Sequence, residues 1–264
     1  MKNMFLRMFK KQKDFDLKRL KKAVPGDFFY YDTTSSTNVE AKNKSNIKDK
    51  SVFLAREQLS GRGRLGRSWN SNAGDGIFMS IVLVPDIPAS TISTLTLLSG
   101  LAVSRVLEGS RVKWPNDVLF NDKKVSGILT EMVMIDNNPD RIIVGIGVNV
   151  GNKSFPCELL DKATSLYLET GKMYDKTDII IKILNEFFSM YDIFLKDGIS
   201  SLMGELKEKC VTLGKTVVVE RSGEKIVARA VDITDNGELL IEKDGEKIAL
   251  ASGEVSVRGL LGYN

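Results

Sequence analysis

Residues 111–150 restrict the fold more than any other part of the chain. They contain three apolar runs, 111–120, 124–135 and 142–150, and only a few residues separate each run from the next. Connections this short can join antiparallel strands, whereas parallel strands need a crossover of about a dozen residues or more. The segment therefore predicts antiparallel hairpins and argues against a doubly wound parallel sheet.

Strand and helix patterns on both sides of this segment complete the first domain. Three apolar runs are typical of strands, at 27–31, 51–56 and 77–84. Apolar residues at helical spacing predict helices at 88–108, 175–195 and 199–210. This mixture predicts an α+β domain over residues 26–210, with a mainly antiparallel mixed sheet and helices.

After residue 210 the pattern changes to five short strand-like runs separated by turn residues such as Ser222-Gly223 and Asp244-Gly245. The runs lie at 215–221, 225–234, 238–243, 247–251 and 254–258. Short strands at such regular spacing predict a small barrel of about 50 residues. We therefore expect a second domain over 211–264, with the boundary near 209–213.

The N-terminal segment is strongly basic. Residues 1–24 hold nine Lys or Arg and two Asp, and the whole chain has a net charge of +4, so the other 240 residues sum to −3. Phe5, Met8 and Phe9 follow helical spacing and predict a basic helical extension over 1–25 that packs one face on the body. Contact with a membrane or a nucleic acid is the alternative. The mildly acidic body argues against a broad nucleic-acid surface.

Several functional classes are excluded by composition. The chain has no histidine, which removes Ser-His-Asp and Cys-His catalysis and most zinc sites. No apolar run reaches the roughly 18 residues of a membrane span, and the N-terminus lacks the apolar core of a secretory signal. Cys157 and Cys210 lie far apart and match no metal or disulfide pattern, so we expect reduced thiols and a cytoplasmic location.

A short loop between two predicted strands alternates glycine with arginine, GRGRLGR at 61–67. Glycine lets backbone amides approach a ligand closely, and arginine supplies planar donors suited to carboxylate or phosphate. A solvated surface loop is one alternative. An RNA-binding Gly-Arg segment is another, although such segments normally lie in disordered tracts.

The sequence KWPND at 113–117 interrupts an apolar run, and Pro115 marks an edge, bulge or loop because it cannot donate to a sheet ladder. Asp117 is a candidate ligand for a nucleotide-bound magnesium ion. The alternative is a turn in which Asn116 and Asp117 cap the backbone. For Lys124, just beyond, the alternative is a hairpin lysine that faces solvent.

A third cluster, TTSSTN at 33–38, groups small hydroxyls with an amide after a strand. Helix capping explains one of these residues but not the whole group. Such a group suits a pocket for a ligand with fixed hydrogen-bonding edges.

Together these motifs resemble the biotin–protein ligases. The resemblance rests on Ser36-Thr37-Asn38, Gln58, 61–67, 113–117, Lys124 with Gly127-Ile128-Leu129, Gly145, Gly147, Asn149, Thr164-Ser165-Leu166 and 253–258. Each motif alone is weak, but the ordered set, from about residue 28 to 260, is highly specific. The resemblance implies a catalytic domain similar to class II aminoacyl-tRNA synthetases and a C-terminal SH3-like barrel.

The resemblance also implies a two-step reaction. Biotin and MgATP give biotinyl-5′-adenylate and pyrophosphate, and the biotinyl group then passes to a lysine of a biotin carboxyl carrier domain of a carboxylase. The residues implied to contact biotin are Ser36, Thr37, Asn38, Gln58, Arg62, Gly63, Arg64, Lys124 and Gly127. Those implied to serve ATP or the adenylate are Arg64, Arg67, Trp69, Lys113, Asn116, Asp117, Asn149 and Arg258.

Elementary chemistry agrees with a histidine-free site. In the first step a carboxylate attacks, so no general base is needed, and the difficulty is repulsion between two anions. We expect four side chains to catalyse this step by neutralising and positioning the two anions, namely Arg62, Arg64, Lys113 and Lys124. A Mg²⁺ ion near Asp117 is expected to assist them. The second step needs a neutral amine, and Asp117 is the hypothetical base. We expect the 61–67 loop to close over the ligands and exclude water.

Alternatives to this interpretation stay open. A lipoate or octanoate ligase would share the catalytic fold, but the polar Ser36, Thr37, Asn38 and Gln58 suit the ureido group of biotin. A non-enzymatic nucleic-acid binder built on the barrel and basic tail is the second alternative. Because only about 25 residues precede the match, we expect a monofunctional ligase without a DNA-binding repressor domain. A homodimer through sheet edges is compatible with the family, and no membrane partner is expected.

Overall fold

The computed structural model describes residues 14–85, 87, 91–136, 138–221, 224–252 and 256–259. The helix predicted from Phe5, Met8 and Phe9 therefore lies outside the described residues. Within the rest of the extension, helix α1 (Leu17–Ala23) begins after Asp16, whose carboxylate accepts hydrogen bonds from the amides of Lys18 and Arg19. Phe15 and Leu20 are buried, so this segment packs on the body.

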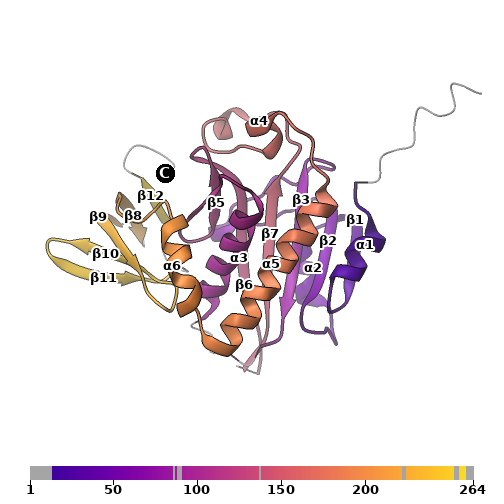
Figure 1. The fold of residues 1–264 in the computed structure, drawn as a ribbon, viewed down its shortest axis with the longest axis horizontal. Helices are drawn as coiled ribbons and strands as arrows, with labels where there is room; N and C mark the ends of the chain where they lie inside the picture. The colour runs from indigo at the N-terminus through magenta and orange to yellow at the C-terminus, as the bar shows by residue number, and fades with distance from the viewer. Residues whose placement is uncertain are drawn as a thin grey trace, which may run out of the picture.

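A seven-stranded sheet forms the centre of the larger domain (Figure 1). In chain order its strands are β1 (Phe28–Thr34), β2 (Ser51–Gln58), β3 (Gly76–Leu83), β4 (Arg111–Lys113), β5 (Asp117–Phe120), β6 (Lys123–Ile135) and β7 (Asn138–Asn149). The spatial order is β1-β2-β3-β7-β6-β5-β4. The β1–β2 pair is parallel and the other pairs are antiparallel, which confirms the predicted mixed, mainly antiparallel sheet.

The predicted run 111–120 is not one strand but two. β4 ends at Lys113 and β5 starts at Asp117, with a turn through Trp114, Pro115 and Asn116 between them. Proline has no amide hydrogen to continue the ladder, so the chain leaves the sheet here, as Pro115 predicted. The Trp114–Pro115 peptide bond is cis.

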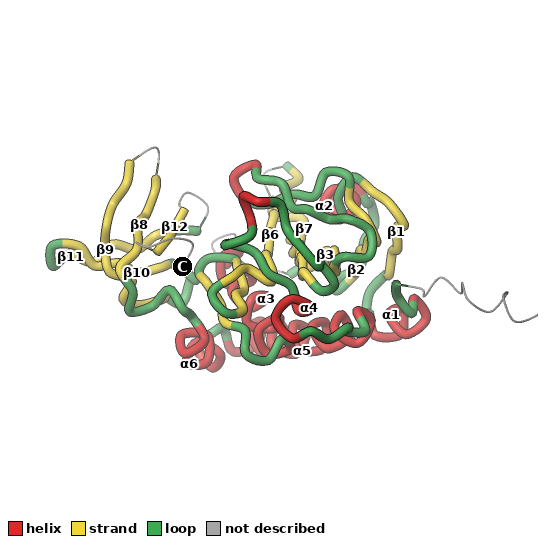
Figure 2. Tube along the Cα trace, turned by 90° about the horizontal axis from the view of Figure 1, so that it is seen from above, coloured by secondary structure: helices red, strands yellow, loops and turns green. Residues whose placement is uncertain are grey.

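Helices α3 (Ile92–Val106), α5 (Lys176–Asp197) and α6 (Ser200–Lys209) lie on one side of the sheet, and α2 (Thr37–Asn43) lies on the other (Figure 2). α5 begins at the N-cap Asp175, which accepts from the amide of Thr177, and ends at Gly198, whose φ is 73°. The short helices α2 and α4 (Leu166–Thr170) were not predicted as helices.

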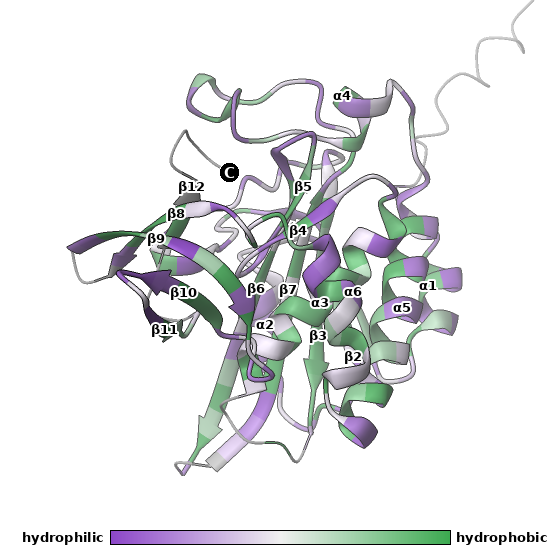
Figure 3. Ribbon diagram, turned by 60° about the vertical axis from the view of Figure 1, so that its left-hand side comes forward, coloured by the Kyte–Doolittle hydropathy of each residue, from purple (hydrophilic) through white to green (hydrophobic). Residues whose placement is uncertain are grey.

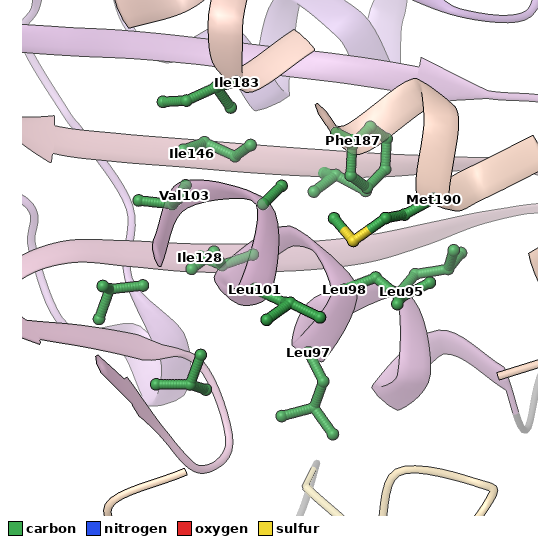
Figure 4. Packing of buried hydrophobic residues seen from close by; sticks show 14 of the residues in the cluster. Leu95, Leu97, Leu98, Leu101, Val103, Ile128, Ile146, Ile183, Phe187 and Met190 are labelled. Carbon is green, nitrogen blue, oxygen red and sulfur yellow. The ribbon is translucent and has the colours of Figure 1, made fainter. Parts of the chain in front are cut away.

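The main core lies between this helical layer and the sheet. Figure 4 shows side chains of α3 and α5 packed together beside Ile128 of β6 and Ile146 of β7. β3 is buried along its whole length, as its continuous apolar run predicted. Arg105 of α3 also joins the helices, because its guanidinium lies 3.0 Å from Glu186 of α5 and 2.5 Å from Glu205 of α6.

The C-terminal residues form a separate five-stranded antiparallel sheet. Its strands are β8 (Thr216–Arg221), β9 (Glu224–Ile233), β10 (Leu239–Lys243), β11 (Glu246–Leu250) and β12 (Ser256–Gly259), in the order β11-β10-β9-β8-β12. All five predicted runs become strands. The predicted SH3-like barrel is not confirmed, because within the described residues β11 and β12 are the open edges of the sheet. Figure 3 shows both hydrophobic and hydrophilic residues along the β10–β11 hairpin.

A tight seam joins the two sheets. The indole Nε1 of Trp114 donates to the carbonyl of Gly237, in the turn between β9 and β10, at 3.0 Å. A Cβ at Gly237 would lie 2.9 Å from the amide nitrogen of Thr94, so the turn packs directly against α3. Val218 of β8 and Val257 of β12 line the same cavity as residues 113–117. No helix in the described part of the chain combines the length and apolar character of a membrane span.

Candidate active site

A cavity of about 770 Å³ opens between the ends of the central strands, the glycine–arginine loop and the C-terminal sheet. It is lined by every predicted site residue except Arg258: Ser36, Thr37, Asn38, Gln58, Arg62, Gly63, Arg64, Arg67, Trp69, Lys113, Asn116, Asp117, Lys124, Gly127 and Asn149. Arg258 lies in β12 next to Val257, which lines the cavity, but its side chain is outside the described set. Residues far apart in the sequence thus converge on one space.

One end of the cavity is polar and buried. Ser36 occupies the N-cap position of α2, although its side chain makes no capping hydrogen bond, and Thr37 follows it. Gln58 Oε1 accepts from the backbone amide of Thr37 at 2.8 Å and from its hydroxyl at 3.2 Å. Gln58 Nε2 donates to the hydroxyl of Ser71 at 2.9 Å. These bonds fix the base of the loop to the start of α2.

Trp69 packs against two facing glycines that line the cavity. Gly127 of β6 and Gly147 of β7 are register partners. A Cβ at Gly127 would lie 2.8 Å from the indole, and one at Gly147 would lie 2.6 Å from it. The indole can therefore rest on the sheet only because both side chains are absent. Its Nε1 is buried without a hydrogen-bond partner among the described residues.

The other end of the cavity is charged. Lys124 Nζ lies 2.6 Å from Asp117 Oδ1 and 5.1 Å from the centroid of the Trp69 ring. The side chains of Lys124 and Asp117 are only 22% and 14% exposed, so the solvent-facing alternative for Lys124 is wrong. Lys113, the register partner of Asp117, is also buried.

The glycine–arginine loop reaches this charged end through Arg64. Arg64 Nη1 donates to Asn116 Oδ1 at 3.0 Å, and Nη2 donates to the carbonyl of Ser252, in the turn after β11. Asn116 is held in turn by its Nδ2, which donates to the carbonyl of Ile128 at 3.0 Å. Burial lowers the pKa of the Arg64 guanidinium, and the carboxylate of Asp117 opposes that shift. Arg62 and Arg67 are exposed but still line the cavity.

Asn149 closes the site from the end of β7. Its Nδ2 donates to the carbonyl of Thr164 at 3.0 Å. Ser165, next in the chain, caps α4 by accepting from the amide of Leu168 at 3.1 Å. The Thr164-Ser165-Leu166 motif therefore joins the end of the central sheet to α4.

Comparison with known proteins identifies the family. A profile of the Biotin/lipoate A/B protein ligase family matches residues 29–149, and one of the Biotin protein ligase C terminal domain matches 212–258. The Bifunctional ligase/repressor BirA of Bacillus subtilis is 35% identical over 233 residues, which cover 84% of this chain and 72% of the relative. The Biotin--[acetyl-CoA-carboxylase] ligase of Mycobacterium tuberculosis is 32% identical, covering 84% of this chain and 85% of the relative. The chain belongs to the biotin protein ligase family.

A solved structure supports the same assignment. The biotin protein ligase from Aquifex aeolicus in complex with biotin and ATP has a TM-score of 0.79 and 33% sequence identity. The match covers 88% of this chain and 99% of that chain. The resemblance drawn from the ordered motifs, and the enzyme class that it implied, are confirmed.

The cavity of this biotin protein ligase also contains residues that the motifs did not mark. Phe78, Met79 and Ile146 supply apolar walls from the sheet. They lie within long apolar runs, and a continuously apolar run does not reveal which residue meets a ligand. A further group comes from segments without a recognisable motif: Phe155, Leu159, Lys162, Ala163, Val218, Glu220 and Lys225.

The described residues of this biotin protein ligase contain no group of three or more His, Cys, Asp or Glu side chains that could enclose a metal ion. Asp117 is the carboxylate at the charged end of the cavity, and Lys124 is already bound to it. Mg²⁺ usually keeps several waters and binds one or two carboxylates together with substrate phosphates. The donor set thus fits a magnesium ion that arrives with a nucleotide rather than one held by the protein alone.

Proposed function

We propose that this biotin protein ligase forms biotinyl-5′-adenylate from biotin and MgATP and transfers the biotinyl group to a lysine of a biotin carboxyl carrier domain. The observation that carries the proposal is the two-ended cavity. A neutral, buried hydrogen-bonding end at α2 and a cationic end at Lys113, Lys124 and Arg64 line the same 770 Å³ space. The similarity to a ligase structure with bound biotin and ATP supports it.

The polar end suits the ureido ring of biotin. Ser36, Thr37, Asn38 and Gln58 offer donors and acceptors at fixed positions, and Phe78 adds an apolar wall for the rest of the ligand. In this arrangement the valeryl chain runs past Gly127 and Gly63 towards Lys124, whose ammonium binds the carboxylate. A lipoyl or octanoyl group would leave the buried polar groups unpaired, which weakens its binding.

The cationic end suits the triphosphate. Here a carboxylate oxygen of biotin attacks the α-phosphorus of ATP. A new P–O bond forms and gives the mixed anhydride, while the bond from the α-phosphorus to the pyrophosphate oxygen breaks and pyrophosphate leaves. Arg62, Arg64, Lys113 and Lys124 reduce the repulsion between the two anions and stabilise the charge that develops on the phosphoryl oxygens. Arg67, Asn116, Asn149 and Arg258 position the nucleotide, and the free indole N–H of Trp69 offers it a donor. Asp117 would hold the magnesium ion, which neutralises phosphate charge when bound.

Asp117 has a second role in the transfer step. The acceptor lysine gives a proton to the Asp117 carboxylate, and the resulting amine attacks the carbonyl carbon of the mixed anhydride. An amide bond forms, the bond to the phosphate oxygen breaks, and AMP leaves. The glycine–arginine loop, closed over the ligands, keeps water from competing with the lysine.

Other features of the sequence interpretation belong to the same proposal. They are the division into 1–25, 26–210 and 211–264, closure of the C-terminal strands into an SH3-like barrel, a cytoplasmic location, a homodimer, and a ligase that does not repress transcription. The profile match at 212–258 supports a C-terminal unit, and the net charge of −3 on residues 25–264 supports the absence of a broad DNA surface. Salt-dependent DNA binding without adenylation would contradict the last point.

Mass spectrometry of a carrier domain tests the proposed function directly. After incubation with the protein, biotin and MgATP, the carrier should gain one biotinyl group on lysine, and omission of ATP should abolish the gain. ATP–pyrophosphate exchange with biotin or lipoate as the acid then separates the two ligase classes. Exchange with lipoate alone, or no exchange and no labelled carrier, would overturn the proposal.

A further inference from the structure

Asn38 is held in one orientation by groups on both sides of its amide. It is the second residue of α2 and is almost fully buried. Its Nδ2 donates to Glu131 Oε2 at 2.7 Å and to the carbonyl of Leu129 at 3.3 Å. The hydroxyl of Ser80, on β3, donates to its Oδ1 at 2.5 Å. Both amide hydrogens are therefore used within the protein, whereas Oδ1 keeps one lone pair.

The reverse orientation of the amide is unfavourable. Turning the group by 180° would place Oδ1 against the Glu131 carboxylate and the Leu129 carbonyl, which are both acceptors. Glu131 is the charged partner in this set, and hydrogen bonds to a charged group are stronger than those between neutral groups. The orientation of Asn38 is therefore decided mainly by Glu131.

Asn38 also cannot relax towards the sheet. A Cβ at Gly145 would clash with Asn38 Oδ1 and lie 3.0 Å from its Cγ and 3.1 Å from its Nδ2, so the amide, with its oxygen nearest, already rests on the backbone of β7. Asn38 and Gly145 both line the cavity. Oδ1 is thus held at a fixed place on the cavity wall, between Ser80 and Gly145.

We propose that Glu131 is a specificity-determining positioning residue, which fixes Asn38 as a hydrogen-bond acceptor and so selects ligands with an N–H donor at that place. Under the proposed function, on which this inference rests, the donor is a ureido N–H of biotin. The dithiolane ring of lipoate has no such donor. Glu131 touches no ligand in this account and acts only through Asn38.

Isothermal titration of the full chain with biotin, dethiobiotin and ATP tests this role. Replacing Glu131 by methionine (Glu131→Met) keeps the length of the side chain but removes the acceptor. We expect binding of biotin and of dethiobiotin, which keeps the urea, to weaken by about tenfold or more, with unchanged affinity for ATP. Glu131→Gln keeps an acceptor oxygen and should restore binding to within about threefold of the wild type.

Thr130→Val is the matched control. Thr130 precedes Glu131 on β6 and bonds Thr96 of α3 at 2.8 Å, on the opposite face of the sheet. Loss of the Thr130 hydroxyl should leave the affinity for biotin unchanged. A double-mutant cycle gives a readout that a purely structural role would not give, because Glu131→Met should have little further effect on biotin binding once Asn38→Ala is present. Glu131→Ala replaces the methionine variant if the latter does not fold.

The outcomes separate this inference from the proposed function. If the wild type binds neither biotin nor dethiobiotin, the proposed function fails and the inference fails with it. If the wild type binds biotin and Glu131→Met binds it equally well, only the inference fails. Equal weakening of biotin and ATP together with a lowered melting temperature would show a structural role and would also overturn it.

Discussion

The ammonium of Lys124 forms a mostly buried ion pair with Asp117, 2.6 Å from its Oδ1. The two residues lie on neighbouring strands, joined by the β5–β6 hairpin, and Gly127 is the register partner of Asp117. An ammonium therefore already has a binding position against this carboxylate. In the proposed transfer step, the ammonium of the acceptor lysine approaches Asp117 in a comparable way.

The Asp117→Asn variant tests whether this carboxylate acts as the base. Supplied biotinyl-5′-adenylate bypasses the first step, so only the transfer is measured. We expect the rate of carrier labelling to fall by about 10²-fold or more, because an amide cannot accept the proton. Asp122→Asn, in the exposed turn between β5 and β6, is the control and should keep the wild-type rate. Unimpaired transfer by Asp117→Asn would refute the assignment.

Gly147→Ala tests the position of Trp69. The new methyl group would lie 2.6 Å from the indole, so the ring must leave its place on the sheet. We expect the affinity for ATP and the rate of adenylate formation to fall by about tenfold or more, with a modest loss of stability of about 1–3 kcal/mol. Calorimetric titration, pyrophosphate release and urea unfolding measure these effects.

Gly204→Ala provides the comparison for that substitution. Gly204 lies in α6, and a Cβ there would meet no atom within 4 Å. Alanine should therefore stabilise the protein by up to about 1 kcal/mol through helix propensity and leave activity unchanged. Wild-type nucleotide binding by Gly147→Ala would show that Trp69 is not placed by the facing glycines.

Much of the sheet could be predicted because local sequence decides it. The connections around 121–123 and 137–140 are too short for anything but hairpins, and Pro115 marked the break between β4 and β5. The helix α2 was missed because its first residues also fit a polar pocket. In the structure Thr37 and Asn38 belong to the helix and also line the cavity. The closed barrel was predicted from strand spacing alone, which does not determine whether the edge strands meet.

Site residues whose type indicates a chemical role could be predicted from the sequence. Those that reach the cavity only through tertiary packing were missed. Arg64 was marked by its charge between glycines, and Lys124 by the family motif that it shares with Gly127. Glu220 and Lys225 reach the cavity because the turn at Gly237 packs on α3, and no local pattern encodes that docking. Glu131 was missed for a similar reason, since its importance depends on its hydrogen bond with Asn38, which lies on α2 and is distant in the sequence.

The ion pairs of Arg105 predict an acid-sensitive contact between α3 and α6. The hydrogen bond from Arg105 lowers the pKa of Glu205, so its folded pKa lies below its unfolded value of about 4.3. The stability from this pair is present above about pH 4.3 and is lost as the pH falls through the folded pKa. Glu205→Gln should therefore destabilise the protein at neutral pH, by less than about 1 kcal/mol since the pair is partly exposed.

Urea unfolding at several pH values measures that effect. The difference in the free energy of unfolding between the wild type and Glu205→Gln should shrink as the pH falls from about 6 to about 3. Glu208→Gln on the same helix, which forms no described side-chain ion pair, should show little difference at any pH. If this difference in the free energy of unfolding stays constant with pH, the charge of Glu205 does not contribute to stability.

Closure of the glycine–arginine loop is the last prediction. The loop offers trypsin three arginines, and Arg62 and Arg67 are exposed. If the loop closes over biotin and the adenylate, saturating biotin and MgATP should slow cleavage between residues 61 and 73 by about tenfold or more, because cleavage requires the open form. Cleavage in the exposed β10–β11 hairpin, at Lys243 and Lys247, should continue at the same rate and serves as an internal control. Mass spectrometry of the fragments distinguishes the two sites, and nicking in the loop that is unchanged by the ligands would contradict its role as a lid.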